Sequence, residues 1–192
     1  MFLLNEITLL LASNLIFTRA IGLSTVLLVS KSRKDLICTA SVITVFTTIG
    51  SIAAYFINWL LGSENQIFAL ALYTLSTALI YVMILAGTYI VNRKFFGKIK
   101  KFIHLSAFNT AVTGSLLVIS ENDFISAEGF SLTKYIFAGL ESGLGFVLVS
   151  LVLSAAIGRL DTSKVPRSFR GLPAMLVYLG IISMAFYSAG II

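Results

Sequence analysis

The stretch SAFNTAVTGS, residues 106–115, places five hydroxyl or amide side chains within ten positions of an otherwise apolar region. A continuous membrane helix gains little from so many polar groups, because hydrocarbon offers them no hydrogen-bond partners. They are typical of a helix that is interrupted inside the membrane, where the freed backbone groups line a site instead of facing lipid. The residues leave one alternative open, in which small polar side chains only let helices pack closely.

The composition places this stretch in an integral membrane protein. The chain has 192 residues, of which 58% are hydrophobic and 11% are charged, and its mean hydropathy is +0.99. A soluble domain carries about 25% charged residues. A bilayer crossing needs about 20 apolar residues. We therefore predict a single, all-α membrane domain over residues 1–192, with six transmembrane helices at about 7–29, 36–60, 67–91, 102–119, 135–157 and 171–191.

The basic residues alternate between loops, which predicts the orientation of the chain. Twelve of the 14 lysines and arginines lie in the first, third and fifth loops. Basic loops stay in the cytoplasm, so we expect these three loops inside and both termini outside. A nucleic-acid-binding surface is the interpretation that this pattern disfavours. The twelve residues are Lys31, Arg33, Lys34, Arg93, Lys94, Lys98, Lys100, Lys101, Arg159, Lys164, Arg167 and Arg170.

Six helices divide into two halves, at about residues 1–92 and 93–192. An odd number of helices in each half gives the two halves opposite orientations. The first helix of each half is also the polar one, reading SNLIFTRAIGLST at 13–25 and HLSAFNTAVTGS at 104–115. This pattern predicts a 3+3 inverted repeat in which interrupted helices 1 and 4 meet near the bilayer midplane.

Several motifs resemble one family of six-helix membrane proteins. They read SNLIFTRAIGLSTVLLVSK at 13–31, FNTAVTG at 108–114, GFVLVSLVLSAAIGRL at 145–160 and VPRSFRG at 165–171. The family consists of the membrane subunits RnfA and NqrE, together with their inverted relatives RnfE and NqrD. They belong to the Rnf and sodium-pumping NADH:quinone oxidoreductase complexes. The outward termini expected above agree with the RnfA/NqrE side of the family.

The resemblance implies a function for the chain. It would form a transmembrane electron-transfer core with an opposite-facing RnfE/NqrD-like homologue in a bacterial or archaeal cytoplasmic (inner) membrane. That core would join an NADH- or ferredoxin-oxidising module to flavin-carrying subunits and couple electron flow to export of sodium ions or protons. The chain would then be a non-catalytic subunit of an oxidoreductase. Two alternatives remain: a small-solute transporter or membrane substrate-binding component that uses the two half-helices, and a purely structural paralogue.

The resemblance also identifies a cofactor position at which this sequence departs from the family. In the family, one cysteine from each interrupted helix helps to hold a 2Fe-2S cluster. The matching positions here are Ser24 and Thr110. Such clusters are held by soft thiolates, so hydroxyls argue against one, and we predict no cofactor or metal. Cys38, the only cysteine, is too far along the chain from Ser24 to substitute. We expect the position to be lined by Ser24 and Thr110 together with Gly22, Leu23, Asn109 and Ala111.

Three further residues are candidates for ion binding or gating. Arg19 would be costly facing lipid, so it is expected to point to the protein interior or a wet crevice. Asn14 shares the same predicted helix. Glu141 lies early in the fifth helix, where its carboxylate would pair with Arg19, bind a cation, or be hydrated near the outer surface. His104, the only histidine, is expected to be a hydrogen-bonded structural residue.

Overall fold

The structure is a computed structural model that describes residues 21–22, 25, 33–61, 66–125, 131–160 and 166–188. These residues form helices and connecting turns, and no strand occurs among them. The helices are α4 (Arg33–Leu61), α5 (Gln66–Val91), α6 (Arg93–Ala107), α7 (Thr110–Ile125), α8 (Leu132–Leu160) and α9 (Leu172–Ser188), with a short 3-10 helix, η2 (Arg167–Phe169), before α9.

The described helices confirm an all-α membrane protein. Segments of α4, α5 and α8 are long and apolar enough to cross a bilayer. The consecutive helices α6 and α7 form a fourth candidate span, bent by 48° at the break between them. A shorter apolar helix at Pro173–Ala185 lies within α9. Five of the six predicted stretches therefore coincide with these helices, and the predicted interruption of the fourth stretch is present. Of the first predicted stretch, only residues 21, 22 and 25 are described.

One expected loop is helical. The basic segment NRKFFGKIKK was predicted to connect two spans, but α6 begins at Arg93, one residue after α5 ends. The side chain of Asn92 accepts a hydrogen bond from the Lys94 backbone N–H at 2.9 Å, as an N-cap residue does. Ile99 and Ile103 then face the core while Lys98 and Lys101 are exposed. This amphipathic spacing lets a charged segment remain helical outside the hydrocarbon.

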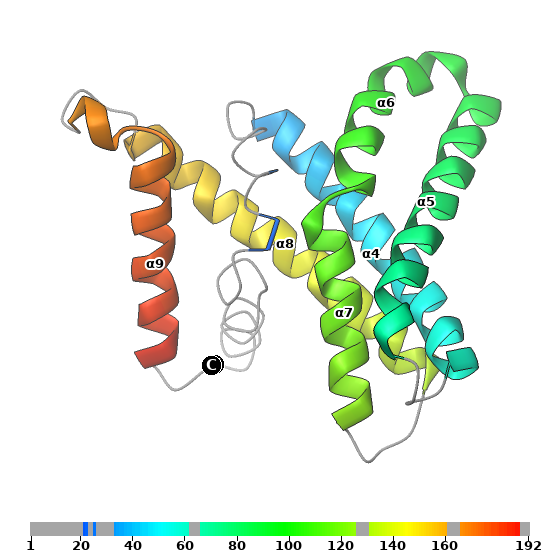
Figure 1. Cartoon of the computed structure of the whole chain (residues 1–192). Helices are drawn as coiled ribbons and strands as arrows, with labels where there is room; N and C mark the ends of the chain where they lie inside the picture. The colour runs from blue at the N-terminus through cyan, green and yellow to red at the C-terminus, as the bar shows by residue number, and fades with distance from the viewer. Residues whose placement is uncertain are drawn as a thin grey trace, which may run out of the picture.

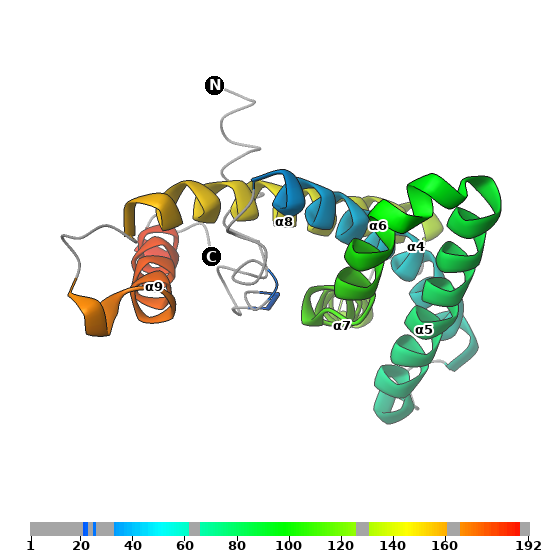
Figure 2. The ribbon, with the colours of Figure 1, turned by 90° about the horizontal axis from the view of Figure 1, so that it is seen from above.

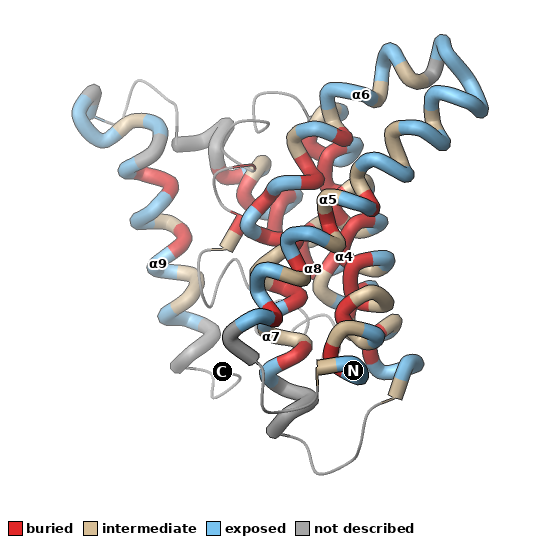
Figure 3. Tube along the Cα trace, turned by 45° about the vertical axis from the view of Figure 1, so that its right-hand side comes forward, coloured by how far each residue is buried: buried red, intermediate tan, exposed pale blue. Residues whose placement is uncertain are grey.

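Helix α4 is the centre of the bundle and α5 is at its edge. In α4, 44% of the apolar window is buried, against 17% in α5. Helices α6, α7 and α8 pack around α4 (Figure 1). Viewed from above, α9 lies on the opposite side of the bundle from α5 (Figure 2). Buried positions are concentrated where α4, α6, α7 and α8 face one another (Figure 3). The core that results includes Ile43, Phe46, Val112, Phe146 and Val149.

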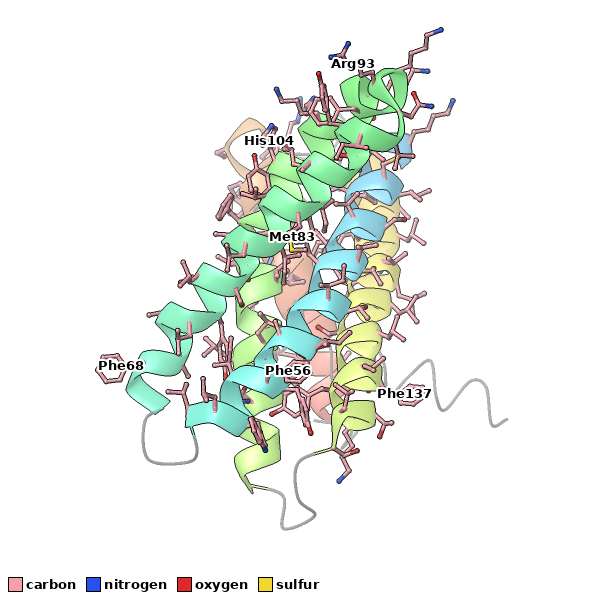
Figure 4. All side chains as sticks on the ribbon, turned by 90° about the vertical axis from the view of Figure 1, so that its right-hand side faces the viewer. Phe56, Phe68, Met83, Arg93, His104 and Phe137 are labelled. Atoms are coloured by element: carbon pink, nitrogen blue, oxygen red, sulfur yellow. The ribbon has the colours of Figure 1, made fainter. Side chains whose placement is uncertain are left out.

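The two ends of the bundle differ in charge. Arg93 lies at one end and Phe68 and Phe137 lie at the other (Figure 4). The end that holds Arg93 also holds the start of α4, the basic first half of α6 and η2. The described residues of the basic loops therefore share one end of the molecule, as the alternation of charge along the sequence predicts.

Helices α4 and α8 approach each other closely because α8 presents glycines to α4. A Cβ atom built on Gly143 would lie 2.6 Å from Thr44 Cγ2 and 2.7 Å from the Thr44 Cα. One built on Gly139 would lie 2.2 Å from Ser51 Oγ. Small residues at such crossings allow the backbones to pack directly, which is a main source of helix association in lipid.

We expect Gly143→Ala to destabilise the protein, because the added methyl group meets the backbone of Thr44, which cannot rotate away. Overpacking of this kind costs about 1–3 kcal/mol. Gly87→Ala is the matched control, since a Cβ at Gly87 meets nothing within 4 Å. Thermal unfolding of the two variants in lipid nanodiscs measures the effect. Equal midpoints for the two variants would contradict the close α4–α8 approach.

A buried polar cluster joins four helices near the other end of the bundle. The amide of Asn58 in α4 donates to Ser120 Oγ in α7 at 2.9 Å and to Tyr135 OH in α8 at 2.8 Å. The hydroxyl of Tyr73 in α5 donates to Asn58 Oδ1 and lies 2.7 Å from Ser120 Oγ. All four residues are at most 4% exposed. Because each group satisfies another, the cluster ties the helices together at a depth where water is absent.

Asn58→Leu should destabilise the bundle by more than its change in volume implies. The substitution removes partners from three buried hydroxyls at once, and each unsatisfied buried polar group costs about 1–3 kcal/mol. Thr74→Val, on the exposed face of α5, is the control because its hydroxyl bonds only to Ala71 of its own helix. The midpoint of chemical or thermal unfolding should fall for the first variant alone.

Candidate functional site

The break between α6 and α7 is made by hydrogen bonds of Asn109 rather than by proline or glycine. The Asn109 N–H donates to the Ser106 carbonyl at 3.3 Å, which closes the end of α6. Its side-chain Oδ1 accepts from the Ala111 N–H at 3.1 Å, and its carbonyl accepts from the Val112 N–H at 3.0 Å. Asparagine is among the preferred N-cap residues because its side chain satisfies a first-turn donor in this way.

A turn from the first predicted span lies directly against this break. Gly22 has φ +85, a left-handed conformation that glycine adopts without strain. Its backbone N–H donates to Thr110 Oγ1 at 3.2 Å, across 88 residues of sequence. A Cβ on Gly22 would lie 2.7 Å from Ala111 Cβ and 2.8 Å from Phe146 Cε2. Figure 1 shows this short dark blue segment beside α8 and the start of α7. Only glycine fits the position, on grounds of both conformation and space.

A second close contact holds the same turn in place. A Cβ on Gly114, one turn into α7, would lie 2.7 Å from Ile21 Cγ2. The Thr25 N–H donates to the Gly22 carbonyl at 3.2 Å, so the chain resumes a helical path after the turn. The turn and the break therefore pack side by side through Ile21, Gly22, Thr110, Ala111 and Gly114. We call these five residues and Asn109 the junction.

The polar residues of the opening stretch have different roles in the junction. Ser106 is buried and donates to the Thr39 carbonyl of α4 at 3.3 Å. Ser115 is buried and donates to the Ala111 carbonyl of its own helix at 2.8 Å. Asn109 is 4% exposed, and its Nδ2 has no hydrogen-bond partner within the part of the chain that the structure describes. Thr110 is exposed at the surface of the chain. The junction thus offers one hydroxyl and one buried amide donor.

The structure brings together four of the residues singled out from the sequence: Gly22, Asn109, Thr110 and Ala111. Asn14, Arg19, Leu23 and Ser24 lie outside the described residues. Glu141 is exposed on α8, whereas Phe146 of the same helix is buried and contacts Gly22.

Some contacts of the site were not predicted. Phe146 packs on the turn, although nothing in the sequence separates it from other core aromatics. Tyr81 OH lies 2.5 Å from His104 Nδ1, and the two rings lie 5.5 Å apart. His104 is therefore the hydrogen-bonded structural residue that the sequence predicts. The only signal for its partner was a tyrosine in the neighbouring apolar stretch.

The residues at the junction do not fit a 2Fe-2S cluster. Thr110 Oγ1 already accepts the Gly22 N–H, and its hydroxyl lies 3.5 Å from Asn109 Oδ1. Cluster iron is held by thiolates, which a neutral hydroxyl does not replace. Cys38 is exposed on α4, and its neighbour Thr39 is the residue that contacts α6. No described group of three or more His, Cys, Asp or Glu residues is placed to hold a metal ion. We derive no electron-transfer step through such a cluster.

Thr110→Val should weaken the junction without changing the iron content. The valine keeps the shape of threonine but leaves the Gly22 N–H without its acceptor, at a cost of about 0.5–1.5 kcal/mol. Thr110→Ser, which keeps the hydroxyl, is the matched control. Thermal unfolding should separate the two variants, and metal analysis should give equal iron for both and for the parent protein. Iron lost specifically on removal of the hydroxyl would identify Thr110 as a ligand.

Comparison with known proteins gives matches along nearly the whole chain. Residues 3–192 match a family described as "Rnf-Nqr subunit, membrane protein". The chain is 28% identical over 181 residues to the RnfA subunit of the ion-translocating oxidoreductase complex of Aromatoleum aromaticum, covering 92% of this chain and 89% of that protein. It is 29% identical over 191 residues to the protein of the same name from Shigella boydii, covering 96% and 94%. The Shewanella baltica protein of that name is 28% identical over 191 residues, with the same coverage.

Proposed function

The chain belongs to the Rnf-Nqr family of membrane subunits, and we propose that it is the RnfA subunit of an ion-translocating oxidoreductase complex. The observation that carries this proposal is similarity along almost the entire chain to proteins that bear that name. The apolar helices and the bent α6–α7 span agree with a membrane component of such a complex. The alternatives of a solute transporter and a structural paralogue have no comparable support.

The proposed orientation places both termini outside a bacterial or archaeal cytoplasmic membrane. It is supported by the shared position of Lys34, Arg93, Lys94 and Arg170 at one end of the bundle. Clusters of basic residues next to membrane spans remain on the cytoplasmic side. This end would then face the electron-donating module, and the Asn58 cluster would lie near the outer surface.

The proposed internal organisation is an inverted repeat that pairs with an opposite-facing homologous subunit. Its support is the contact between the Gly22 turn and the Asn109 break, which come from corresponding places in the two halves. Interrupted helices that meet in this way are typical of membrane proteins built from inverted repeats. We propose that Ser24 and Leu23, which follow Gly22 in sequence, line the same site. Asn14, Arg19 and Glu141 remain candidates for ion binding or gating.

The role proposed for this chain is to shape and seal the transmembrane core rather than to carry out chemistry. Thr110 and Asn109 present a hydroxyl and an amide donor at the break. These groups can orient a neutral or anionic acceptor, and they close the backbone of the break against lipid. Oxidation of NADH or ferredoxin would be performed by other subunits, and electron flow would be coupled to export of sodium ions or protons.

The test is to purify the tagged full chain from membranes of its native host in mild detergent. We expect flavin-carrying and NADH- or ferredoxin-oxidising subunits to co-purify, because the chain would be integral to their complex. Deleting the chain should abolish NADH- or ferredoxin-driven ion uptake by inverted membrane vesicles, and a copy carrying Gly87→Ala should restore it. A chain that purifies alone, in cells whose electron-driven ion transport survives the deletion, would refute the proposal.

A further inference from the structure

Glu141 is an exposed carboxylate well inside a membrane span. The candidate span of α8 runs over 25 residues, Leu132–Ala156. At 1.5 Å per residue, Glu141 lies about 13 Å from the start of that span. The span is about 37 Å long at that rise, against about 30 Å of hydrocarbon, so Glu141 lies about 10 Å inside the hydrocarbon when the span is centred. Its side chain has two methylenes and is too short to reach the headgroups.

The carboxylate has no partner among the residues that the structure describes. Gly139 and Gly143 show that the face of α8 beside Glu141 packs on α4, while Glu141 itself is on the exposed side. No described residue donates a hydrogen bond to it or pairs with it. A charged side chain that faces lipid at such a depth costs about 2.5–3.5 kcal/mol on insertion scales. Lipid is therefore a poor neighbour for this face.

A groove runs beside Glu141 between α8 and α4. Its volume is about 490 Å³. The α4 wall presents the small hydroxyl residues Ser41, Thr44 and Thr48, and the α8 wall presents Leu140, Leu144 and Val147. Thr44 and Thr48 donate to carbonyls of their own helix at 2.9 and 2.8 Å, so their methyl groups are free to make apolar contacts. Figure 4 shows α4 and α8 side by side, with apolar side chains along their outer edge.

We propose that this face is a subunit interface that receives a transmembrane helix carrying a lysine or arginine at the depth of Glu141. This inference rests on the proposed function, which makes the chain part of a multisubunit complex. Small residues along a groove let a second helix approach closely, and the basic side chain would neutralise the carboxylate away from water. The face is defined by Glu141, Ser41, Thr44, Thr48, Leu140 and Leu144, and we call it the Glu141 face.

Other occupants match the Glu141 face less well. A second copy of the chain, docked symmetrically, would bring two Glu141 carboxylates together, which is unfavourable for like charges in a low dielectric. A metal ion would find one carboxylate, and no described group of three or more acidic, histidine or cysteine side chains is available to complete its coordination. A basic partner helix answers both the charge and the shape of the face.

Photo-cross-linking in native membranes tests the location of the interface. Cys38→Ala removes the only cysteine, so Leu144→Cys in that background carries a benzophenone label at one position. We expect this label to capture another membrane subunit, on a peptide that contains a lysine or arginine within a span. Met83→Cys, at a 74% exposed position of α5, is the control. Capture of lipid alone by the label at position 144, or of another part of the same chain, would overturn the inference.

Charge substitutions test the pairing itself. We expect Glu141→Gln to lower the yield of the captured subunit at least tenfold, and Glu141→Lys to abolish its capture. An acidic residue at the captured basic position should then restore capture of that subunit by Glu141→Lys. Glu121→Gln, near the end of α7, is the control. Undiminished capture with Glu141→Leu would show that the carboxylate has no partner there. If the complex co-purifies while the label captures only lipid, the interface is wrong and the proposed function stands.

Discussion

The absence of water inside the bilayer is the constraint on which the junction depends. Any backbone group that leaves the helical pattern there must find a partner within the protein. At the α6–α7 break, Asn109 provides these partners with its side chain and its own carbonyl. The Gly22 turn finds its acceptor in the Thr110 hydroxyl. The two irregular segments satisfy each other, which explains why they lie side by side although 88 residues separate them in sequence.

Much of the fold follows from local properties of the sequence. The apolar lengths predict α4, α5, α8 and α9 to within a few residues, because the thickness of the bilayer sets the length of a span. The density of polar residues around Asn109 predicts the break. The segment after Asn92 was misassigned as a loop, because its lysines lower the hydropathy although Ile99 and Ile103 keep a helical spacing. Hydropathy reports the depth of a segment in the membrane rather than its secondary structure.

The site was less predictable than the fold. Gly22 and Thr110 were identified as neighbours of one position through family resemblance, whereas the hydrogen bond between them is a tertiary contact that no local pattern encodes. The Asn58 cluster and the Phe146 contact belong to the same class, because they depend on how distant helices come together. The groove beside Glu141 likewise exists only once α8 is laid against α4. Sequence alone identified the unusual residue but not its surroundings.

The continuity of α5 and α6 has a mechanical consequence. Asn92 is the only residue between them, and α6 runs without interruption from the basic end of the bundle to the break at Asn109. A rigid rod of 15 residues therefore connects that basic end to the point where the backbone changes direction. Whatever presses on the lysines at its tip acts on a lever whose pivot is Asn109. Force applied outside the membrane is thereby delivered to its interior without passing through a flexible linker.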